Sequence, residues 1–496
     1  ACQTSTPANI GAGLAWWSRR KNALAERERE MSAPLQHRTG MPYSASPARV
    51  VVVGAGPAGM QAAWAAASSG TKVTLIDANP SLGGEIWRGE QSESRTGTRL
   101  FERIRKSNIR LLSSCQVVDA PRLGTLLCAA NGEPEWVDYD RLIIATGARE
   151  RFLPFPGWTL PNVYGAGGLQ AMARGGLDLK GKRVVICGTG PLLLKVAATL
   201  RERGAELPLI AEQAPFASLL RFAWALRHLP SKYGDALWLG KKLLGAGFRS
   251  GCYPVRAHGL DRLLSVTLRN GTQEWNVRCD YLACGFGLAP NLELPLLLGC
   301  RVDAGFVVAD DWQETSVSGV YCAGEVAGIG GVEKALAEGA IAGLAASHAK
   351  DVPGLRDHAA AWFRERARCR RFASALASRF SLRPELRSIA TPETIVCRCE
   401  DVRMEQLATN ASWREAKRHT RLGAGHCQGR VCGAAVEILK GWPLESLSPP
   451  LFPVSERFLA CAGLCGGEAA VPEQNLSKQS ARTGHPMGRA TAADCE

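Results

Sequence analysis

The sequence predicts an α/β protein made of two parallel-sheet units, the second inserted into the first, followed by a small α-rich domain. Three observations predict this fold class. A run of strand, glycine loop, helix and strand begins near residue 50, a second run of the same kind begins near residue 183, and four cysteines in two close pairs follow late in the chain. A strand that returns through a helix to a parallel strand builds such sheets. The length of 496 residues corresponds to about three domains.

The composition is that of an ordinary globular protein, and it argues against several classes. Apolar residues make up 46% and charged residues 21%. The formal net charge of +14 comes from dispersed residues, so we expect no nucleic-acid partner. Glycine or charge interrupts every long apolar run, so we expect no transmembrane segment. The 17 cysteines are odd in number and scattered, which favours free thiols with one metal site and a cytoplasmic location.

The first run is "ARVVVVGAGPAGMQAAWAAASSGTKVTLIDAN", a dinucleotide-binding fingerprint in its required context. Its first glycine permits a tight turn, its second lets a pyrophosphate approach the backbone, and its third lets the helix pack closely. The helix N-terminus favours an anion, and an acid at the end of the second strand accepts hydrogen bonds from ribose hydroxyls. We therefore assign to a nucleotide site Gly54, Gly56, Pro57, Ala58, Gly59 and Asp77.

Three further stretches narrow the nucleotide to a flavin. They are "LGGEIWR", "LIIATGARE" and "TSVSGVYCAGEVAGIGG", and the residues concerned are Gly84, Thr146, Gly147, Gly324 and Glu325. Together with the fingerprint they resemble the two-dinucleotide-binding-domain flavoproteins, the superfamily of glutathione reductase, thioredoxin reductase and the ferredoxin reductases. The resemblance implies bound FAD, with Glu325 holding the ribityl chain where Asp is commoner.

The second run, "GKRVVICGTGPLLLKVAATLRERGAELPLIAEQ", repeats the pattern with Gly188, Gly190 and a strand that ends at Glu212. In the flavoprotein superfamily this is the position of a nicotinamide-binding domain, and an acid here suits an adenosine ribose. Leu193 replaces the third glycine, which weakens close packing of the helix. Three possibilities stay open at this point: NAD(P), another adenine nucleotide, or an empty site.

The two cysteine pairs are Cys397-x-Cys399 and Cys427-x4-Cys432. Four thiolates hold [2Fe–2S] clusters and also zinc, and the spacing alone does not choose between them. The stretch "KRHTRLGAGHCQGRVC" resembles the bacterioferritin-associated-ferredoxin type of domain, which implies a [2Fe–2S] cluster. Zinc and an empty relic domain remain alternatives.

The order of these parts resembles the A-type subunits of opine oxidases and the related subunits of hydrogen cyanide synthase and heteromeric proline dehydrogenases. The stretches that carry the likeness are "TGARERFLPFPGWTLPNVYGAGGLQ", the incomplete fingerprint "GTGPLLL" and the cysteine domain, within about residues 47 to 460. The resemblance implies a partner subunit, similar to D-amino-acid oxidase, that oxidises an octopine- or nopaline-like opine or an amino acid such as glycine or proline. This chain would pass the electrons through FAD and the cluster to a downstream acceptor, in the cytoplasm or at the surface of the inner membrane.

No His/Asp or Ser/His constellation is evident in the sequence, so we assign no catalytic side chain. Two other interpretations compete with an electron-transfer subunit. A stand-alone NAD(P)H-dependent reductase would serve a ferredoxin-like acceptor, and NADH would bleach its flavin. A non-catalytic scaffold would bind an adenine nucleotide structurally and assemble the partner.

We expect the chain to divide into seven segments. They are an N-terminal extension (1–46), the first part of the FAD-binding domain (47–179), an inserted NAD(P)-like domain (180–290), the second part of the FAD-binding domain (291–350), a helical linker (351–391), the [2Fe–2S] domain (392–445) and a mostly flexible C-terminal segment (446–496). In the linker, apolar residues at helical spacing predict amphipathic helices. Its stretch "RERARCRR" is more typical of a solvated helix face than of a nucleic-acid site.

Overall fold

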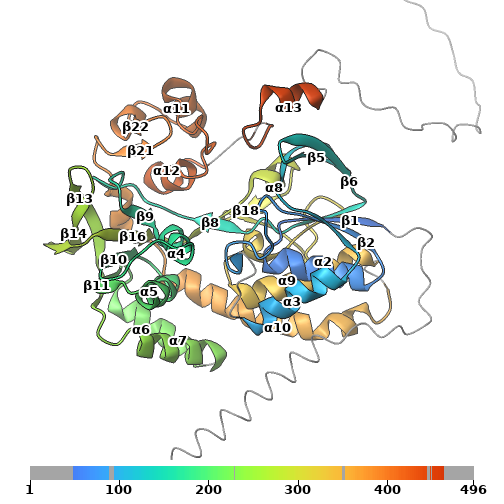
Figure 1. Ribbon diagram of the computed structural model, residues 1–496, viewed down its shortest axis with the longest axis horizontal. Coiled ribbons are helices and arrows are strands. Elements are labelled where there is room, and N and C mark those ends of the chain that lie inside the picture. Colours follow the sequence, from blue (N-terminus) through green and yellow to red (C-terminus); the bar gives the residue numbers. More distant parts are fainter. Residues whose placement is uncertain are drawn as a thin grey trace, which may run out of the picture.

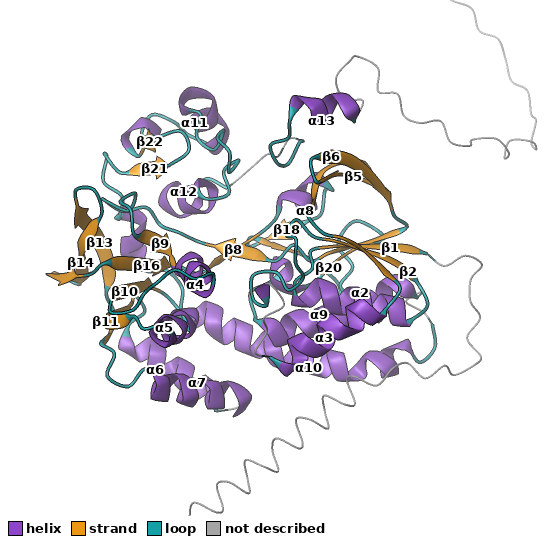
Figure 2. Cartoon of the chain, in the orientation of Figure 1, coloured by secondary structure: helices purple, strands orange, loops and turns teal. Residues whose placement is uncertain are grey.

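The computed structural model describes residues 48–88, 94–227, 230–348, 352–443, 447 and 449–462. The predicted extension 1–46 and residues 463–496 of the C-terminal segment lie outside this part of the chain. The described residues have the predicted α/β fold, with two separate parallel sheets (Figure 1 and Figure 2). Each helix in these residues is too short or too polar to span a membrane.

The first unit is built on a parallel sheet with the strand order β20-β7-β1-β2-β3. Its central strand β1 pairs in register with β2, Val53 opposite Ile76, and with β7, Val53 opposite Ile144. The elements of this unit are β1 (Arg49–Val53), α2 (Pro57–Ser68), β2 (Lys72–Ile76), α3 (Arg95–Lys106), β3 (Ile109–Leu112), β4 (Cys115–Arg122), β5 (Thr125–Ala130), β6 (Glu133–Asp138), β7 (Arg141–Ile144), α8 (Glu293–Leu297), β18 (Val302–Asp303), β19 (Phe306–Val307), β20 (Val320–Cys322), η2 (Gly324–Ala327) and α9 (Val332–Ser347).

Two layers cover this sheet, because successive side chains of a strand point to opposite faces. Val50 and Val52 belong to a core that includes residues of α2, α3 and α9, whereas Val51 and Val53 belong to a core that includes residues of the antiparallel strands β4 to β6. Helices α2 and α9 lie side by side below the sheet (Figure 1). They approach so closely that a Cβ at Gly339 of α9 would lie 2.2 Å from the carbonyl oxygen of Ala58.

The second unit has its own parallel sheet, with the strand order β12-β11-β10-β16-β9. Helices α4 and α5 share one core with it, and the antiparallel strands β13 to β15 share another. The elements are β9 (Val163–Gly165), α4 (Ala166–Arg174), β10 (Arg183–Gly188), α5 (Leu192–Glu202), β11 (Glu206–Glu212), α6 (Phe216–Leu226), α7 (Pro230–Lys242), β12 (Phe248–Ser250), β13 (Tyr253–Gly259), β14 (Leu263–Asn270), β15 (Gln273–Arg278) and β16 (Tyr281–Gly285). Strand β9 lies before residue 180, where we expected the inserted domain to begin, and it nevertheless pairs with β16 of this sheet.

Two short antiparallel strands connect the units. Strand β8 (Ala148–Glu150) leaves the first unit and β17 (Leu288–Pro290) returns to it, with Arg149 opposite Ala289. Figure 1 shows β8 between the two sheets. The side chains of these strands and of the residues beside them therefore lie at the junction of the two nucleotide-binding folds.

The linker contains one continuous helix, α10 (Leu355–Arg379), followed by the short 3-10 helix η3 (Pro384–Ser388). We expected a solvated arginine face on this helix, and for Arg366 that expectation is wrong. Arg366 is only 4% exposed and donates hydrogen bonds to the carbonyl oxygen of Asp311 and to Gln313 Oε1. It therefore fastens the helix to the first unit.

The cysteine domain is small and has a core of its own, which includes Val396, Trp413 and Val436. Its elements are β21 (Ile395–Cys397), β22 (Val402–Arg403), η4 (Glu405–Leu407), α11 (Trp413–Thr420) and α12 (Cys432–Lys440). The indole N–H of Trp158, in the second unit, donates a hydrogen bond of 2.6 Å to the carbonyl oxygen of Ile395. The domain is thus attached to the second unit at its first strand.

Residues 449–462, in the segment that we expected to be mostly flexible, pack on the first unit. The backbone N–H of Leu451 donates to the carbonyl oxygen of Val118 at 2.7 Å. Helix α13 (Glu456–Cys461) buries Phe458 against Val118 and Leu127. Apolar burial therefore orders this part of the C-terminal segment.

Candidate functional site

The glycines of the first fingerprint have different surroundings. Gly54 has φ +105°, and a Cβ there would lie 2.3 Å from the carbonyl oxygen of Ala145. A Cβ at Gly59 would lie 1.7 Å from the carbonyl oxygen of Gly54, whereas a Cβ at Gly56 would meet nothing within 4 Å. The first and third glycines are thus required by the packing of the chain itself, and the space beside Gly56 is left free for another group to approach the backbone.

Asp77 closes this loop from the neighbouring strand. Its Oδ2 accepts from the backbone N–H of Ala55 at 2.5 Å, and its Oδ1 accepts from the backbone N–H of Asn79 at 2.7 Å. The loop after β2 folds back over the fingerprint, because a Cβ at Gly84 would lie 3.0 Å from Gly56 Cα. The structure therefore brings Asp77 and Gly84 to the fingerprint.

Gly324 and Glu325 reach the same region from the late strand β20. A Cβ at Gly324 would lie 2.9 Å from the Cβ of Ala58, at the start of α2. Glu325 Oε1 accepts from the backbone N–H of Gly331 at 3.2 Å, and burial raises the pKa of Glu325 above its ordinary value. Helix α2 and the end of β20 thus form two sides of one region.

A buried ion pair that the sequence analysis missed supports this region. Lys334 Nζ lies 2.6 Å from Glu338 Oε2, with side chains 4% and 1% exposed, and it also donates to the carbonyl oxygen of Gly324. Glu338 Oε2 accepts from the backbone N–H of Gly324 at 3.1 Å. A Lys and a Glu four residues apart in a small-residue helix, soon after the late strand, was the signal available in the sequence.

Thr146 and Gly147 lie where the first unit passes into β8. Thr146 Oγ1 donates to the carbonyl oxygen of Asn291 at 2.9 Å, and Asn291 Nδ2 donates to the carbonyl oxygen of Thr146 at 2.7 Å. Gly147 has φ +67°, and a Cβ there would meet nothing within 4 Å. The junction is therefore held by reciprocal hydrogen bonds next to open space.

Two partly buried arginines follow at this junction, and the sequence analysis missed both. Arg149 Nη1 donates to Asn291 Oδ1 and to Glu293 Oε1, each at 2.7 Å. The Nε atoms of Arg149 and Arg151 are buried without a hydrogen-bond partner among the described residues. A buried N–H without a partner is costly, so these two groups fit a site that receives a polar or anionic ligand.

Glu150 lies between these arginines in the sequence and faces helix α4. The backbone N–H of Gly167 donates to its two carboxyl oxygens at 3.0 and 3.1 Å. Burial raises the pKa of Glu150 to about 7, although the N–H groups of α4 oppose the shift. In the sequence, the acid directly after "TGAR" was the signal that could have identified Glu150 as a site residue. Such a group is suited to exchange a proton near neutral pH.

The residues of the second fingerprint are also close together, and its acid is bonded to the glycine loop as Asp77 is in the first. Gly188 has φ +141°, and a Cβ there would lie 1.8 Å from the carbonyl oxygen of Gly285. Glu212 Oε2 accepts from the backbone N–H of Gly190 at 2.7 Å. Burial raises the pKa of Glu212 to about 7. Leu193, in place of the third glycine, is 2% exposed and packs in the core beside α4.

The four cysteines of the C-terminal domain come together as a series of interacting thiols. Cys432 interacts with Cys397 and with Cys427, and Cys427 interacts with Cys399. The interaction with the neighbouring Cys432 thiol is the main cause that lowers the pKa of Cys397 to about 6 and the pKa of Cys427 to about 4. Within the described residues, no group of three or more His, Cys, Asp or Glu side chains already has the arrangement of a metal site. The cysteines form no disulfide, so four sulfur donors are available, the set that zinc and [2Fe–2S] clusters take.

A charged bridge joins the cysteine domain to the junction of the two units. Arg430 Nε lies 3.6 Å from Glu293 Oε1, the oxygen that also accepts from Arg149. Arg430 Nη1 donates to the carbonyl oxygen of Cys427 at 3.2 Å. The loop that carries Cys427 is therefore linked through two arginines and one glutamate to strand β8.

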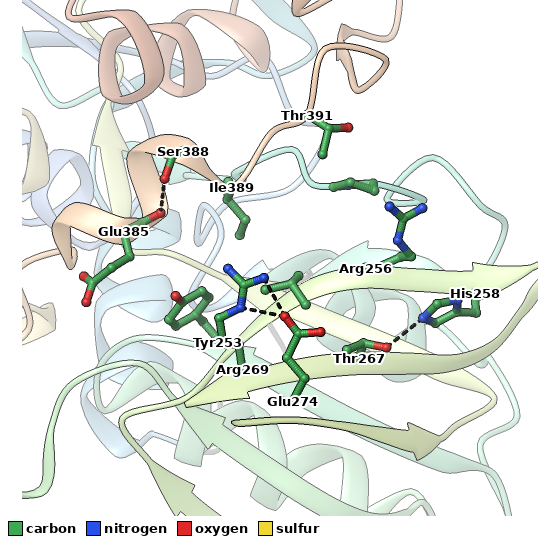
Figure 3. Close-up of a pocket in the computed structure, with 12 residues that line it drawn as sticks. Tyr253, Arg256, His258, Thr267, Arg269, Glu274, Glu385, Ser388, Ile389 and Thr391 are labelled. Atoms are coloured by element: carbon green, nitrogen blue, oxygen red, sulfur yellow. Dashed lines mark hydrogen bonds and ion pairs between the residues drawn. The ribbon is translucent and has the colours of Figure 1, made fainter. Parts of the chain in front are cut away.

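A pocket of about 320 Å³ lies elsewhere, between β13, β14, β15 and η3 (Figure 3). Figure 3 shows Arg269 paired with Glu274, and His258 hydrogen-bonded to Thr267 at 2.7 Å. None of the residues that line this pocket was assigned to the site. It marks the cleft between the linker and the antiparallel strands of the second unit.

Comparison with known proteins identifies the relatives of this chain. The sequence model of the pyridine nucleotide-disulphide oxidoreductase family matches residues 31–340. The HcnB subunit of hydrogen cyanide synthase from Pseudomonas protegens is 31% identical over 462 residues, covering 82% of this chain and 98% of that protein. The A-type subunit of opine oxidase from Rhizobium meliloti is 32% identical over 450 residues, covering 82% of this chain and 96% of that protein.

Among solved structures, L-proline dehydrogenase from P. horikoshii has a TM-score of 0.55 at 18% identity, covering 86% of this chain and 82% of that one. This likeness shows a shared fold. The family match implies sites for FAD and NAD(P). The chain belongs to the pyridine nucleotide-disulphide oxidoreductase family and is a FAD-dependent oxidoreductase related to the A-type subunit of opine oxidase and to the HcnB subunit of hydrogen cyanide synthase.

Proposed function

We propose that this chain is the electron-transfer flavoprotein subunit of a heteromeric oxidase or dehydrogenase that acts on an opine or an amino acid. The observation that carries the proposal is the extent of the likeness to two named subunits, which covers 82% of this chain and so exceeds the part matched by the family model. The partner that we infer is a flavoprotein subunit similar to D-amino-acid oxidase. Octopine- or nopaline-like opines, glycine and proline are the candidate substrates, and a downstream acceptor receives the electrons.

The residues of the first unit would hold FAD in this proposal. Gly54, Gly56, Pro57, Ala58, Gly59 and Asp77 would hold its adenine end, and Gly84, Thr146, Gly147, Gly324 and Glu325 would contact the rest. Bound flavin accepts two electrons together and releases them singly. The open spaces beside Gly56 and Gly147 support this assignment, as do the buried Nε–H groups of Arg149 and Arg151.

The four cysteines, Cys397, Cys399, Cys427 and Cys432, would hold a [2Fe–2S] cluster. Four thiols from two short stretches of the chain are a suitable donor set, and the bridge through Arg430 and Glu293 connects them to the junction with the flavin domain. Zinc would use the same donors. The iron content of the protein distinguishes the two metals.

The test is the visible spectrum and iron content of the full chain, purified anaerobically without its partner. We expect flavin bands with a broad sulfur-to-iron shoulder that bleaches on reduction. Cys427→Ser should remove the shoulder and most of the iron while the flavin bands remain, because the cysteine domain has a core of its own. The matched control is Cys461→Ser, at an exposed cysteine outside the cysteine domain, which should keep both signals. Unchanged iron in Cys427→Ser, or zinc in its place, would contradict the cluster assignment.

We also propose that the protein works in the cytoplasm at the surface of the inner membrane. Helices α6 and α7 expose large apolar side chains: Phe216 is 62%, Trp224 68% and Leu237 60% exposed. Cations accompany the tryptophans, with the Arg227 guanidinium 3.7 Å from the ring centre of Trp224 and Lys242 Nζ 4.0 Å from that of Trp238. Exposed aromatic residues among basic ones are typical of helices that lie on anionic lipid surfaces.

A stand-alone NAD(P)H-dependent reductase is the second candidate, and family membership favours it because the family implies NAD(P). It requires a usable nicotinamide site in the second unit. Rapid bleaching of the flavin by NADH in the absence of any partner would support this candidate and contradict the electron-transfer subunit.

A further inference from the structure

The second fingerprint has the local form of a nucleotide site, yet its surroundings differ from those of the first. A Cβ at Gly56 would point into open space, whereas a Cβ at Gly190 would lie 4.0 Å from Phe380 Cγ. Phe380 follows directly after helix α10, and its ring packs edge to face on Phe222 of α6, with the ring centres 4.9 Å apart. The glycine that should face a pyrophosphate is therefore faced by a side chain of the protein itself.

The residues after Phe380 continue along the carboxyl ends of the second sheet. Gln213, directly after β11, binds this stretch twice: its Nε2 donates to the carbonyl oxygen of Ser381 at 3.1 Å, and its Oε1 accepts from the backbone N–H of Arg383 at 3.0 Å. Arg383 Nη1 donates to the carbonyl oxygen of Gly251, directly after β12, at 3.0 Å. Nucleotides bind parallel α/β sheets outside these carboxyl ends. Residues 380–383, called the linker segment below, lie in that place.

Glu212, the acid expected to bind a ribose, already has donors from the chain. Its Oε1 accepts from Thr189 Oγ1 at 2.9 Å and from the backbone N–H of Ala214 at 2.8 Å, and its Oε2 accepts from the backbone N–H of Gly190 at 2.7 Å. Glu212 is 3% exposed. Asp77 of the first fingerprint is bonded to its own loop in a similar way, so the feature that distinguishes the second fingerprint is the linker segment, which a ribose would have to displace.

We propose that the second fingerprint of this protein is not a nucleotide site but the seat of the linker segment, which closes it and anchors the cysteine domain. The next residues support an anchor, because Leu386 and Ile389 are buried in the core of the second unit, and Trp158 then holds Ile395 of β21. The chain departs here from its family, in which the second unit implies NAD(P). The inference goes beyond the proposed function, because it excludes NAD(P)H bound at the second fingerprint as the source of electrons.

The first test is hydrogen–deuterium exchange on the full chain, with FAD present so that the first fingerprint is filled, and with NADH or NADPH added to millimolar concentration. We expect neither nucleotide to change the exchange of residues 188–193, 212–214 or 380–383. Saturable protection of residues 188–193 by either nucleotide would overturn the proposal.

The second test removes the two hydrogen bonds that hold the linker segment. Gln213→Ala should speed the exchange of the Arg383 amide by about tenfold, the effect of losing a hydrogen bond of ordinary net strength. The matched control is Gln170→Ala, which loses a hydrogen bond to Thr199 Oγ1 in the same unit and should leave residues 380–383 unchanged. Equal exchange in Gln213→Ala and in the unaltered chain would overturn the proposal. Flavin and iron contents of the same samples report separately on the proposed function.

Discussion

At the scale of single residues, Gly56 is the most informative position of the first fingerprint. Its φ is −74°, which any residue adopts, and a Cβ there would meet nothing within 4 Å. We expect Gly56→Ala to leave the free energy of unfolding of the flavin-free chain within about 0.5 kcal/mol of its original value. We expect FAD affinity to fall by about tenfold or more, because the methyl group occupies the approach of the pyrophosphate.

Thermal unfolding and fluorescence titration with FAD measure the two effects. Gly59→Ala is the contrasting variant: its Cβ would lie 1.7 Å from a backbone oxygen, so it should fold poorly even without flavin. Undiminished FAD affinity in Gly56→Ala would remove the nucleotide site from this loop.

Glu150 makes a prediction about pH. Burial raises the pKa of Glu150 from 4.5 to about 7, so the folded chain holds this proton more tightly than the unfolded chain does. The stability that it contributes is fully present below about pH 4.5 and is lost as the pH rises through about 7. Glu150→Gln should therefore flatten the decline in stability across this window, as measured by urea unfolding at several pH values. Because Glu212 is raised to about 7 as well, the decline should become shallower and not disappear. Glu274→Gln, at an exposed ion pair, should keep the original slope, and an equal flattening by both variants would refute the assignment.

At the scale of elements, the pair α6–α7 is apolar on a face that the described chain leaves uncovered. The full chain should sediment with vesicles that contain phosphatidylglycerol and less with neutral phosphatidylcholine vesicles, and added salt should weaken the binding. Trp224→Ser should reduce the binding by about tenfold or more, because a side chain that is 68% exposed would lose its burial in the lipid interface. Trp136→Ser, at a tryptophan of β6 that is 46% exposed, is the control and should bind normally. Equal binding to both kinds of vesicle, or to neither, would count against the proposed membrane surface.

At the scale of the whole molecule, Glu293 is the residue that the cysteine domain and the junction share. It lies between Arg149 and Arg430. The side chains of Arg149, Glu293 and Arg430 are 24%, 9% and 16% exposed. Glu293→Gln would leave two largely buried arginines without their common counter-charge, so we expect a loss of about 3 kcal/mol in the free energy of unfolding. Glu274→Gln at its exposed pair should cost less than about 1 kcal/mol. Urea unfolding followed by tryptophan fluorescence measures both. Losses of the same size would mean that the bridge contributes no more than a surface ion pair.

The local parts of this protein could be predicted from its residues alone. The strands on either side of both glycine loops, the acid directly after β2, the acid that ends β11 and the two cysteine pairs all follow from patterns that span few residues. Such patterns report backbone geometry directly: alternation marks a strand, and a glycine marks a turn or a close approach. The family and its FAD-dependent chemistry were accessible for the same reason, since the first fingerprint and the ends of β7 and β20 keep their local motifs.

Which of these parts meet depends on the folded chain. Gln213 binds Arg383, which lies 170 positions later in the chain. Trp158 binds Ile395, and Glu293 joins Arg149 to Arg430. No local pattern encodes these pairs, because each depends on how completed elements pack and on where a buried polar group finds its partner. Along the chain the two fingerprints differ at the third glycine, where the second has Leu193. Their other difference arises in space: the surroundings of Gly56 are open, whereas those of Gly190 contain Phe380.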